Sequence, residues 1–210
     1  MKFKSMALLT VLCGLQVAFA AEQAPSNVGA GSAEKGQAKA APCVACHGVN
    51  GNSVNPEWPN LAGQHESYIK RQLAAFKSDA RQNPLMQPMA KPLSDEDMAD
   101  LGAFFSSQAL AGNLETDPSK VSLGQKLYRA GDAQKGIPAC AACHGPRGNG
   151  NPAAGYASIR GQHATYAAAQ LKAYRSGTRQ TDPNQMMRNV AANMSDEQID
   201  AVAAYIQGLR

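Results

Sequence analysis

The sequence of 210 residues lacks the features that mark several common protein classes. Beyond residue 20, no apolar run is long enough to cross a membrane. No window alternates polar and apolar residues with the period of a strand, which argues against a β-sheet protein. No run of Lys or Arg occurs, and the aromatic residues are not interleaved with basic ones, so we expect no nucleic-acid binding. Aromatic residues make up only 6% of the chain, which predicts a thin core if protein atoms alone fill it.

Cysteine is also scarce, and its placement is informative. Four of the five cysteines lie in two copies of one motif, Cys43-Val44-Ala45-Cys46-His47 and Cys140-Ala141-Ala142-Cys143-His144. The pattern C-x-x-C-H is the attachment site of c-type haem. Its two thiols reach the vinyl groups of one haem and form thioethers, and the histidine that follows becomes the proximal iron ligand.

A single Cys-x-x-Cys pair could instead be a redox dithiol or half of a zinc site. The histidine at the next position and the second copy of the motif favour haem. We therefore predict two covalently bound haem c groups, whose porphyrins would also supply apolar contacts that the thin core lacks. The residues assigned to them are the thioether-forming cysteines Cys43, Cys46, Cys140 and Cys143 and the proximal ligands His47 and His144.

The first 20 residues have the pattern of a secretory signal. Lys2 and Lys4 precede an apolar stretch, and the segment ends in Ala18-Phe19-Ala20, an A-x-A cleavage pattern. We expect residues 1–20 to be a cleaved signal peptide and the product to be periplasmic. A lipoprotein anchored at Cys13 is the alternative, although Leu12 is larger than the residue that such processing prefers.

The remaining chain is an internal repeat. Gly63-Gln64-His65 recurs as Gly161-Gln162-His163, and Ser94-Asp95-Glu96 recurs as Ser195-Asp196-Glu197. The repeat predicts an N-terminal domain over residues 21–112 and a C-terminal domain over residues 113–210. Each half is expected to run in the order haem motif, loop, helix, methionine-containing loop and final helix.

Helical periodicity runs through both halves. Ile69, Leu73 and Phe76 form an apolar stripe, which Ala167, Leu171 and Tyr174 repeat. Ser94 and Ser195 are expected N-caps of the final helices, with Asp97 and Gln198 at the capping-box position. We predict an all-α fold of two tandem domains that each enclose one haem c.

The sixth ligand of each iron is inferred from the repeat. Met86 and Met187 lie at the same distance before the paired serines, whereas Met89 aligns with Val190 and Met186 with Leu85. Met86 and Met187 are therefore the predicted axial ligands, and His/Met ligation raises the reduction potential and suits electron transfer.

Two alternatives to this ligand set stay open. His65 and His163 also match between the halves and would give bis-histidine ligation, but we interpret them as residues near a haem edge or the domain interface. Pro84 and Pro88 flank Met86 in a compact stretch of the chain. Met89, three residues later, is therefore the alternative sulfur ligand of the first domain.

These motifs resemble the dihaem cytochrome c4 family over the whole chain after the signal segment. The resemblance rests on Cys-x-x-Cys-His-Gly, the Gly-Gln-His segment, the methionine loop and the Ser-Asp-Glu helix of each half. It implies domains related by approximate twofold symmetry, and two His/Met-ligated haem c groups. It also implies a periplasmic electron carrier, often loosely membrane-associated, between quinol-oxidising complexes and terminal oxidases.

A carrier is the expected function, and we expect it to be a monomer. The alternatives are a dihaem redox enzyme, such as a peroxidase or a sulfur-compound oxidising cytochrome, and a cytochrome subunit of a larger dehydrogenase complex. Acidic residues outnumber basic ones in residues 22–112, and the reverse holds in residues 113–210. Such a charge dipole can orient a protein on a redox partner or an anionic membrane surface.

Overall fold

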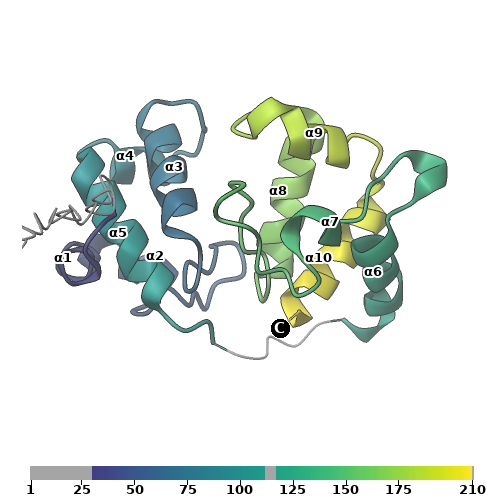
Figure 1. Cartoon of the computed structure of the whole chain (residues 1–210), viewed down its shortest axis with the longest axis horizontal. Helices are drawn as coiled ribbons and strands as arrows, with labels where there is room; N and C mark the ends of the chain where they lie inside the picture. Colours follow the sequence, from purple (N-terminus) through teal and green to yellow (C-terminus); the bar gives the residue numbers. More distant parts are fainter. Residues whose placement is uncertain (1–29, 112–116, 210) are drawn as a thin grey trace, which may run out of the picture.

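The computed structural model describes residues 30–111 and 117–209. They form two helical lobes side by side, one from each half of the chain (Figure 1). The predicted signal peptide and the alternative anchor at Cys13 lie outside the described residues.

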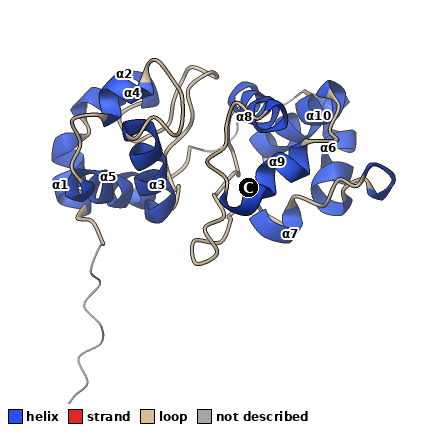
Figure 2. Ribbon diagram, turned by 90° about the horizontal axis from the view of Figure 1, so that it is seen from above, coloured by secondary structure: helices blue, strands red, loops and turns tan. Residues whose placement is uncertain are grey.

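The two lobes repeat one succession of helices. The first contains α1 (Ala33–Lys39), α2 (Ala41–His47), α3 (Glu66–Lys77), α4 (Met86–Ala90) and α5 (Asp95–Ser107). The second contains α6 (Pro118–Ala130), α7 (Ala141–His144), α8 (Ala164–Ser176), α9 (Met186–Ala191) and α10 (Asp196–Gly208), with short 3₁₀ turns η1 (Ala133–Lys135) and η2 (Pro183–Gln185). The described residues contain no strand, only two isolated bridges, which confirms the predicted all-α fold (Figure 2).

The final helix of each lobe organises its core. Helix α5 packs against α1 and α3, and α10 packs in the same way against α6 and α8. Leu101 and Phe105 of α5 and Ile199 and Val202 of α10 are almost completely buried. Both helices begin at the predicted serines with full capping boxes, which satisfy backbone N–H groups that would otherwise lack partners.

The helices that precede the haem motifs, α1 and α6, were not predicted. Each crosses the final helix of its lobe at a glycine. A Cβ on Gly36 would lie 2.0 Å from the Asp100 carbonyl oxygen, and one on Gly124 would lie 2.1 Å from the Ala201 oxygen. Only glycine permits so close an approach of two backbones.

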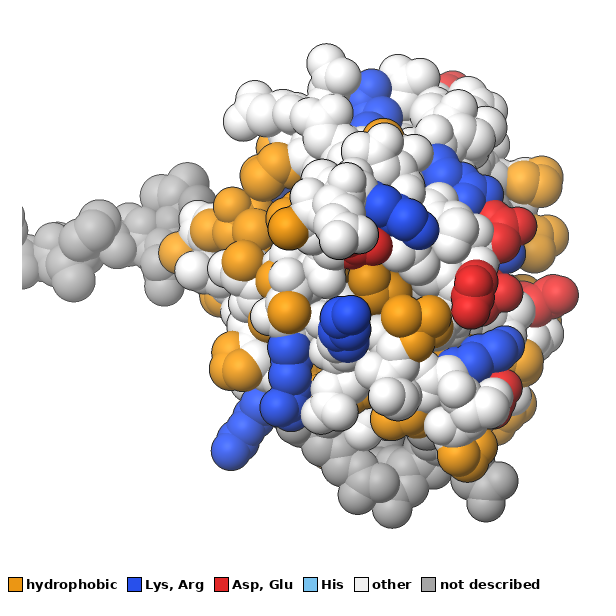
Figure 3. All heavy atoms as spheres, turned by 90° about the vertical axis from the view of Figure 1, so that its right-hand side faces the viewer, with side chains coloured by type: hydrophobic (Ala, Val, Ile, Leu, Met, Phe, Trp, Pro, Cys, Tyr) orange, Lys and Arg blue, Asp and Glu red, His pale blue; other side chains and the backbone are white. Residues whose placement is uncertain are grey.

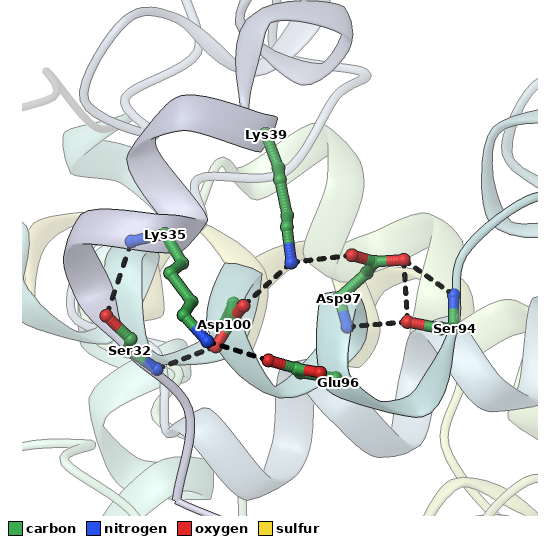
Figure 4. Close-up of polar contacts among 7 residues, drawn as sticks. All are labelled: Ser32, Lys35, Lys39, Ser94, Glu96, Asp97 and Asp100. Atoms are coloured by element: carbon green, nitrogen blue, oxygen red, sulfur yellow. Dashed lines mark hydrogen bonds and ion pairs between the residues drawn. The ribbon is translucent and has the colours of Figure 1, made fainter.

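The two crossings differ chemically. At the first, Lys39 Nζ lies 2.6 Å from Asp97 and 2.8 Å from Asp100, and Lys35 pairs with Glu96 at 2.8 Å (Figure 4). At the second, the residues that align with Lys39, Asp97 and Asp100 are Leu127, Gln198 and Ala201. The α1–α5 contact is therefore ionic and the α6–α10 contact largely apolar.

The second lobe also has a longer connection between its first helix and its haem motif. Residues 131–139 turn back on themselves, and Asp132 and Ile137 exchange backbone hydrogen bonds of 2.8 and 2.9 Å. None of the helices in the described ranges combines the length and the apolarity that a membrane span requires.

Candidate haem sites

The predicted haem motifs lie on short helices that bring their functional groups together. Cys43, Cys46 and His47 belong to the last turns of α2, where residues three and four apart lie on one face. Cys140 caps α7, which carries Cys143 and His144. Cys43 and Cys140 pack against the cores of their own lobes.

The first cysteine of each pair lacks the lowered pKa that is typical of a redox dithiol. All four cysteines of the described residues are free. Burial raises the pKa of the Cys43 thiol, and raises that of Cys140 to about 11. Reactive Cys-x-x-Cys pairs instead have lowered thiol pKa values. In addition, the described part of the chain holds no group of three or more His, Cys, Asp or Glu side chains that could bind a metal ion.

The proximal histidines are held in one tautomer. His47 Nδ1 lies 2.9 Å from the carbonyl oxygen of Pro59, and His144 Nδ1 lies 2.9 Å from that of Ala157. Because a carbonyl only accepts, Nδ1 carries the proton and Nε2 keeps a lone pair for a metal. Burial lowers the pKa of both imidazoles, which favours the neutral form that binds a metal. The donor set therefore fits haem iron.

The two predicted methionines occupy equivalent places. Met86 begins α4, which packs on α3, and Met187 lies in the first turn of α9, which packs on α8. Each precedes a fully buried alanine, Ala90 or Ala191, by one helical turn. The helix register thus agrees with the sequence pairing of Met86 with Met187.

The rival methionines have other surroundings. Met89 is 39% exposed. Met186 Sδ lies 3.8 Å from the hydroxyl of Tyr156, which donates to it. The ring of Tyr156 in turn lies 6.4 Å from that of His144. The exposure of Met89 supports the predicted choice of Met86, whereas the choice of Met187 over Met186 rests on the repeat; both assignments stay predictions.

The matched histidines lie at the domain interface, one of the two places that the sequence suggested. Each is the N-cap of a helix, α3 or α8. His163 is buried, and its Nε2 lies 2.9 Å from the carbonyl oxygen of Ser53 in the other lobe. Since that nitrogen must donate, it has no lone pair for iron.

A pair of buried arginines at the interface was missed by the sequence reasoning. Arg81 and Arg179 each donate to the side-chain oxygens of both Gln72 and Gln170 at 2.7–2.9 Å. The extended repeat, in which Lys77-Ser78-x-x-Arg81 matches Arg175-Ser176-x-x-Arg179, was the available signal.

The matched tyrosines complete this cluster. Tyr68 accepts from Arg179 at 2.9 Å, and Tyr166 accepts from Arg81 at 3.0 Å, so their hydroxyls join the domains. Burial raises the pKa of Tyr68, but the charges of Arg179 and Arg81 outweigh it and leave that pKa below its usual value.

Comparison with known proteins places both lobes in one family. A family model described as cytochrome c matches residues 33–109 and 121–210. Cytochrome c4 of Thiocapsa roseopersicina is 46% identical over 181 residues, which cover 85% of this chain and 93% of that protein. A thiosulfate dehydrogenase electron acceptor of Stutzerimonas stutzeri is 40% identical over 166 residues, covering 78% and 76%.

A solved structure gives the same result. The crystal structure of reduced recombinant cytochrome c4 from Pseudomonas stutzeri superposes with a TM-score of 0.83 at 45% identity. The superposition covers 86% of this chain and all of that one. The similarity therefore includes the arrangement of the two lobes as well as their individual folds.

Proposed function

This chain belongs to the dihaem cytochrome c4 family and is an electron-transfer protein rather than an enzyme, and we propose that it carries electrons from a quinol-oxidising complex to a terminal cytochrome c oxidase. Its two cytochrome c domains imply two covalently bound haem c groups. The observation that best supports the proposal is the matched pair of proximal histidines, each held through Nδ1 by a backbone carbonyl and each with Nε2 available.

The roles of the individual residues follow from this proposal. Haem c supplies one-electron iron chemistry when bound. Two motif cysteines would fix each porphyrin, and the backbone carbonyls that accept from His47 and His144 orient the imidazoles. Met86 and Met187 would supply the sulfur ligands. An iron held by both a histidine and a methionine would have no position open for a substrate, in keeping with a carrier.

We propose a periplasmic location, with residues 1–20 removed as a signal peptide, and a monomer that contacts the membrane surface peripherally. The predicted excess of basic residues in the second half supports an oriented encounter with a charged partner. On the face of the second lobe shown in Figure 3, basic side chains are dispersed among acidic and apolar ones. This dispersal fits a transient electrostatic encounter rather than a nucleic-acid surface.

The proposed route can be tested with the exported holoprotein. A purified quinol-oxidising complex supplied with quinol should reduce both haems, and a purified cytochrome c oxidase should reoxidise them. Both rates should depend on ionic strength, since screening weakens encounter between charged surfaces. Failure of the complex to reduce the protein, or steady turnover of peroxide by the protein alone, would contradict the proposal.

A second route is favoured by the similarity to a thiosulfate dehydrogenase electron acceptor. In that case the donor would be a sulfur-compound dehydrogenase instead of a quinol-oxidising complex, and the protein would still be a carrier. Reduction by thiosulfate that requires the dehydrogenase would support this route. Equal reduction without the dehydrogenase would exclude it.

A further inference from the structure

Each lobe uses one glutamine to hold the backbone of the other. Gln64 Nε2 donates to the Ser158 carbonyl oxygen at 2.7 Å, and Gln64 Oε1 accepts from Ser158 N–H at 2.9 Å. Gln162 repeats the pattern on Asn60, with distances of 3.0 and 2.9 Å. A flat side-chain amide thus satisfies both backbone groups of one residue, as a neighbouring strand would.

The Gln162–Asn60 contact reaches a peptide unit that orients a proximal histidine. The carbonyl of Pro59 and the N–H of Asn60 belong to the same peptide group. That carbonyl accepts from His47 Nδ1, while that N–H donates to Gln162. A continuous hydrogen-bond chain therefore runs from the second lobe to the His47 imidazole of the first.

The Gln64–Ser158 contact is its mirror image. The carbonyl of Ala157 accepts from His144 Nδ1, and the N–H of the same peptide group, that of Ser158, donates to Gln64. Both glutamines are held in register, because their Oε1 atoms also accept from the N–H of the following histidines at 3.0 and 3.1 Å. The amide orientation is unambiguous, since each Oε1 meets only donors.

Hydrogen bonds in a chain polarise one another. An acceptor on the N–H side of a peptide group makes its carbonyl a stronger acceptor, and a stronger Nδ1–H bond makes an imidazole a more basic ligand. A more basic axial ligand stabilises the ferric state and lowers the reduction potential. Loss of the glutamine should therefore raise that potential.

We propose that Gln64 and Gln162 are positioning residues that act across the interface, so that each domain tunes the reduction potential of the haem in the other. Gln162 acts on His47 and Gln64 acts on His144. The inference rests on the proposed function only through the assignment of these histidines as iron ligands.

The test is a potentiometric titration of the holoprotein carrying Gln162→Leu or Gln64→Leu. Gln162→Leu should raise the potential of the first-domain haem and shift the one-electron equilibrium between the haems by about three- to tenfold, the size of one hydrogen bond. Gln64→Leu should do the same to the second-domain haem. The two potential steps are assigned to domains through a Met187→His background.

The matched control is Gln72→Leu, which changes a glutamine of the same interface whose side-chain oxygen accepts from Arg81 and Arg179. It should leave the equilibrium between the haems unchanged. The proton NMR shift of the proximal histidine Nδ1–H in the reduced protein gives a second readout, which should move upfield, as a weaker hydrogen bond predicts, only in the domain opposite each substitution. If either the Gln64→Leu or the Gln162→Leu variant yields too little holoprotein, the other variant provides the equivalent test on the other haem.

A shift in the substituted residue's own domain, an equal shift of both haems, no shift, or the same shift in Gln72→Leu would each overturn the inference. Its failure is distinguishable from failure of the proposed function. A protein that shows the cross-domain shifts but is not reduced by the quinol-oxidising complex contradicts the carrier route alone. Normal reduction without the shifts contradicts the cross-domain role alone.

Discussion

At the scale of single residues, hydrogen-bonding state separates candidate ligands that the sequence treats alike. His47 and His163 are both buried histidines with a carbonyl partner at 2.9 Å. The first uses Nδ1 and leaves Nε2 available, whereas the second uses Nε2 itself. The repeat identified the matched positions, but only the three-dimensional structure reveals which nitrogen each carbonyl engages.

Substitution of the predicted axial methionines should change one haem at a time. Met86→His should lower one potential step and abolish the methionine–iron charge-transfer band of the first domain, because imidazole stabilises ferric iron more than a thioether does. Met187→His should do the same for the second domain. Potentiometric titration and the oxidised absorption spectrum measure both effects.

The neighbouring methionines provide matched controls. Met89→Leu and Met186→Leu keep an apolar side chain and should leave both steps in place, since Leu and Met differ little in volume. If the Met86→His variant kept both potential steps and the Met89→Leu variant lost the methionine–iron charge-transfer band, Met89 would be the ligand instead of Met86.

At the scale of helices, the sequence predicted the elements whose pattern is strong. The capping boxes at Ser94 and Ser195 and the apolar stripes of α3 and α8 were all identified. Helix α1 was missed because its sequence, Ala-Glu-Lys-Gly-Gln-Ala-Lys, has no large apolar residue. Its position depends on the close approach at Gly36 and on ion pairs with α5, both of which are contacts distant in sequence.

The ionic α1–α5 contact should make the stability of the first domain depend on acid pH. In this contact, hydrogen bonds from Lys39 hold the pKa values of the Asp97 and Asp100 carboxyls below their usual range. Carboxyls with a lowered pKa contribute stability that is complete above the unfolded value of 3.8 and is lost as the pH falls through the folded values. Acid titration of thermal unfolding, followed by the fluorescence of the single tryptophan, Trp58, measures this loss.

Lys39→Met gives the corresponding test. It should destabilise the first domain most at neutral pH, and the difference from the parent protein should vanish below the folded carboxyl pKa values. Lys35→Met removes the exposed pair with Glu96 and should have little effect at any pH. An undiminished difference between Lys39→Met and the parent at low pH would show that packing, not charge, holds this contact.

At the scale of the whole molecule, the interface depends on residue pairs about a hundred positions apart. The repeat singled out its matched glutamines Gln64 and Gln162 and histidines His65 and His163, but it did not reveal that Arg81 and Arg179 lie at the same interface. Each guanidinium also stacks on an aromatic ring, Phe76 or Tyr174, at 4.6 Å. No periodicity within one half predicts contacts that exist only between two halves.

Arg179→Leu should uncouple the domains. The variant loses three hydrogen bonds from a buried guanidinium to Tyr68, Gln72 and Gln170, at a cost on the order of 3 kcal/mol. The two domains should then unfold in separate transitions, resolved by Trp58 fluorescence and by calorimetry. The control Arg129→Leu changes an exposed arginine of α6 and should preserve the parent's unfolding profile. Retained coupling in Arg179→Leu would assign the interface energy to the glutamine contacts instead.

The reciprocal pairing of Gln64 with the second lobe and Gln162 with the first is the geometry of an isologous contact, such as two identical subunits form about a twofold axis. Identical subunits would carry redox centres of equal potential, with no driving force between them. Joining both copies in one polypeptide removes that constraint, because the two halves can then differ in sequence. Trp58 of the first half aligns with Tyr156 of the second, and Lys39 aligns with Leu127. The fused chain can therefore give an electron a preferred direction of travel, which a symmetric homodimer cannot.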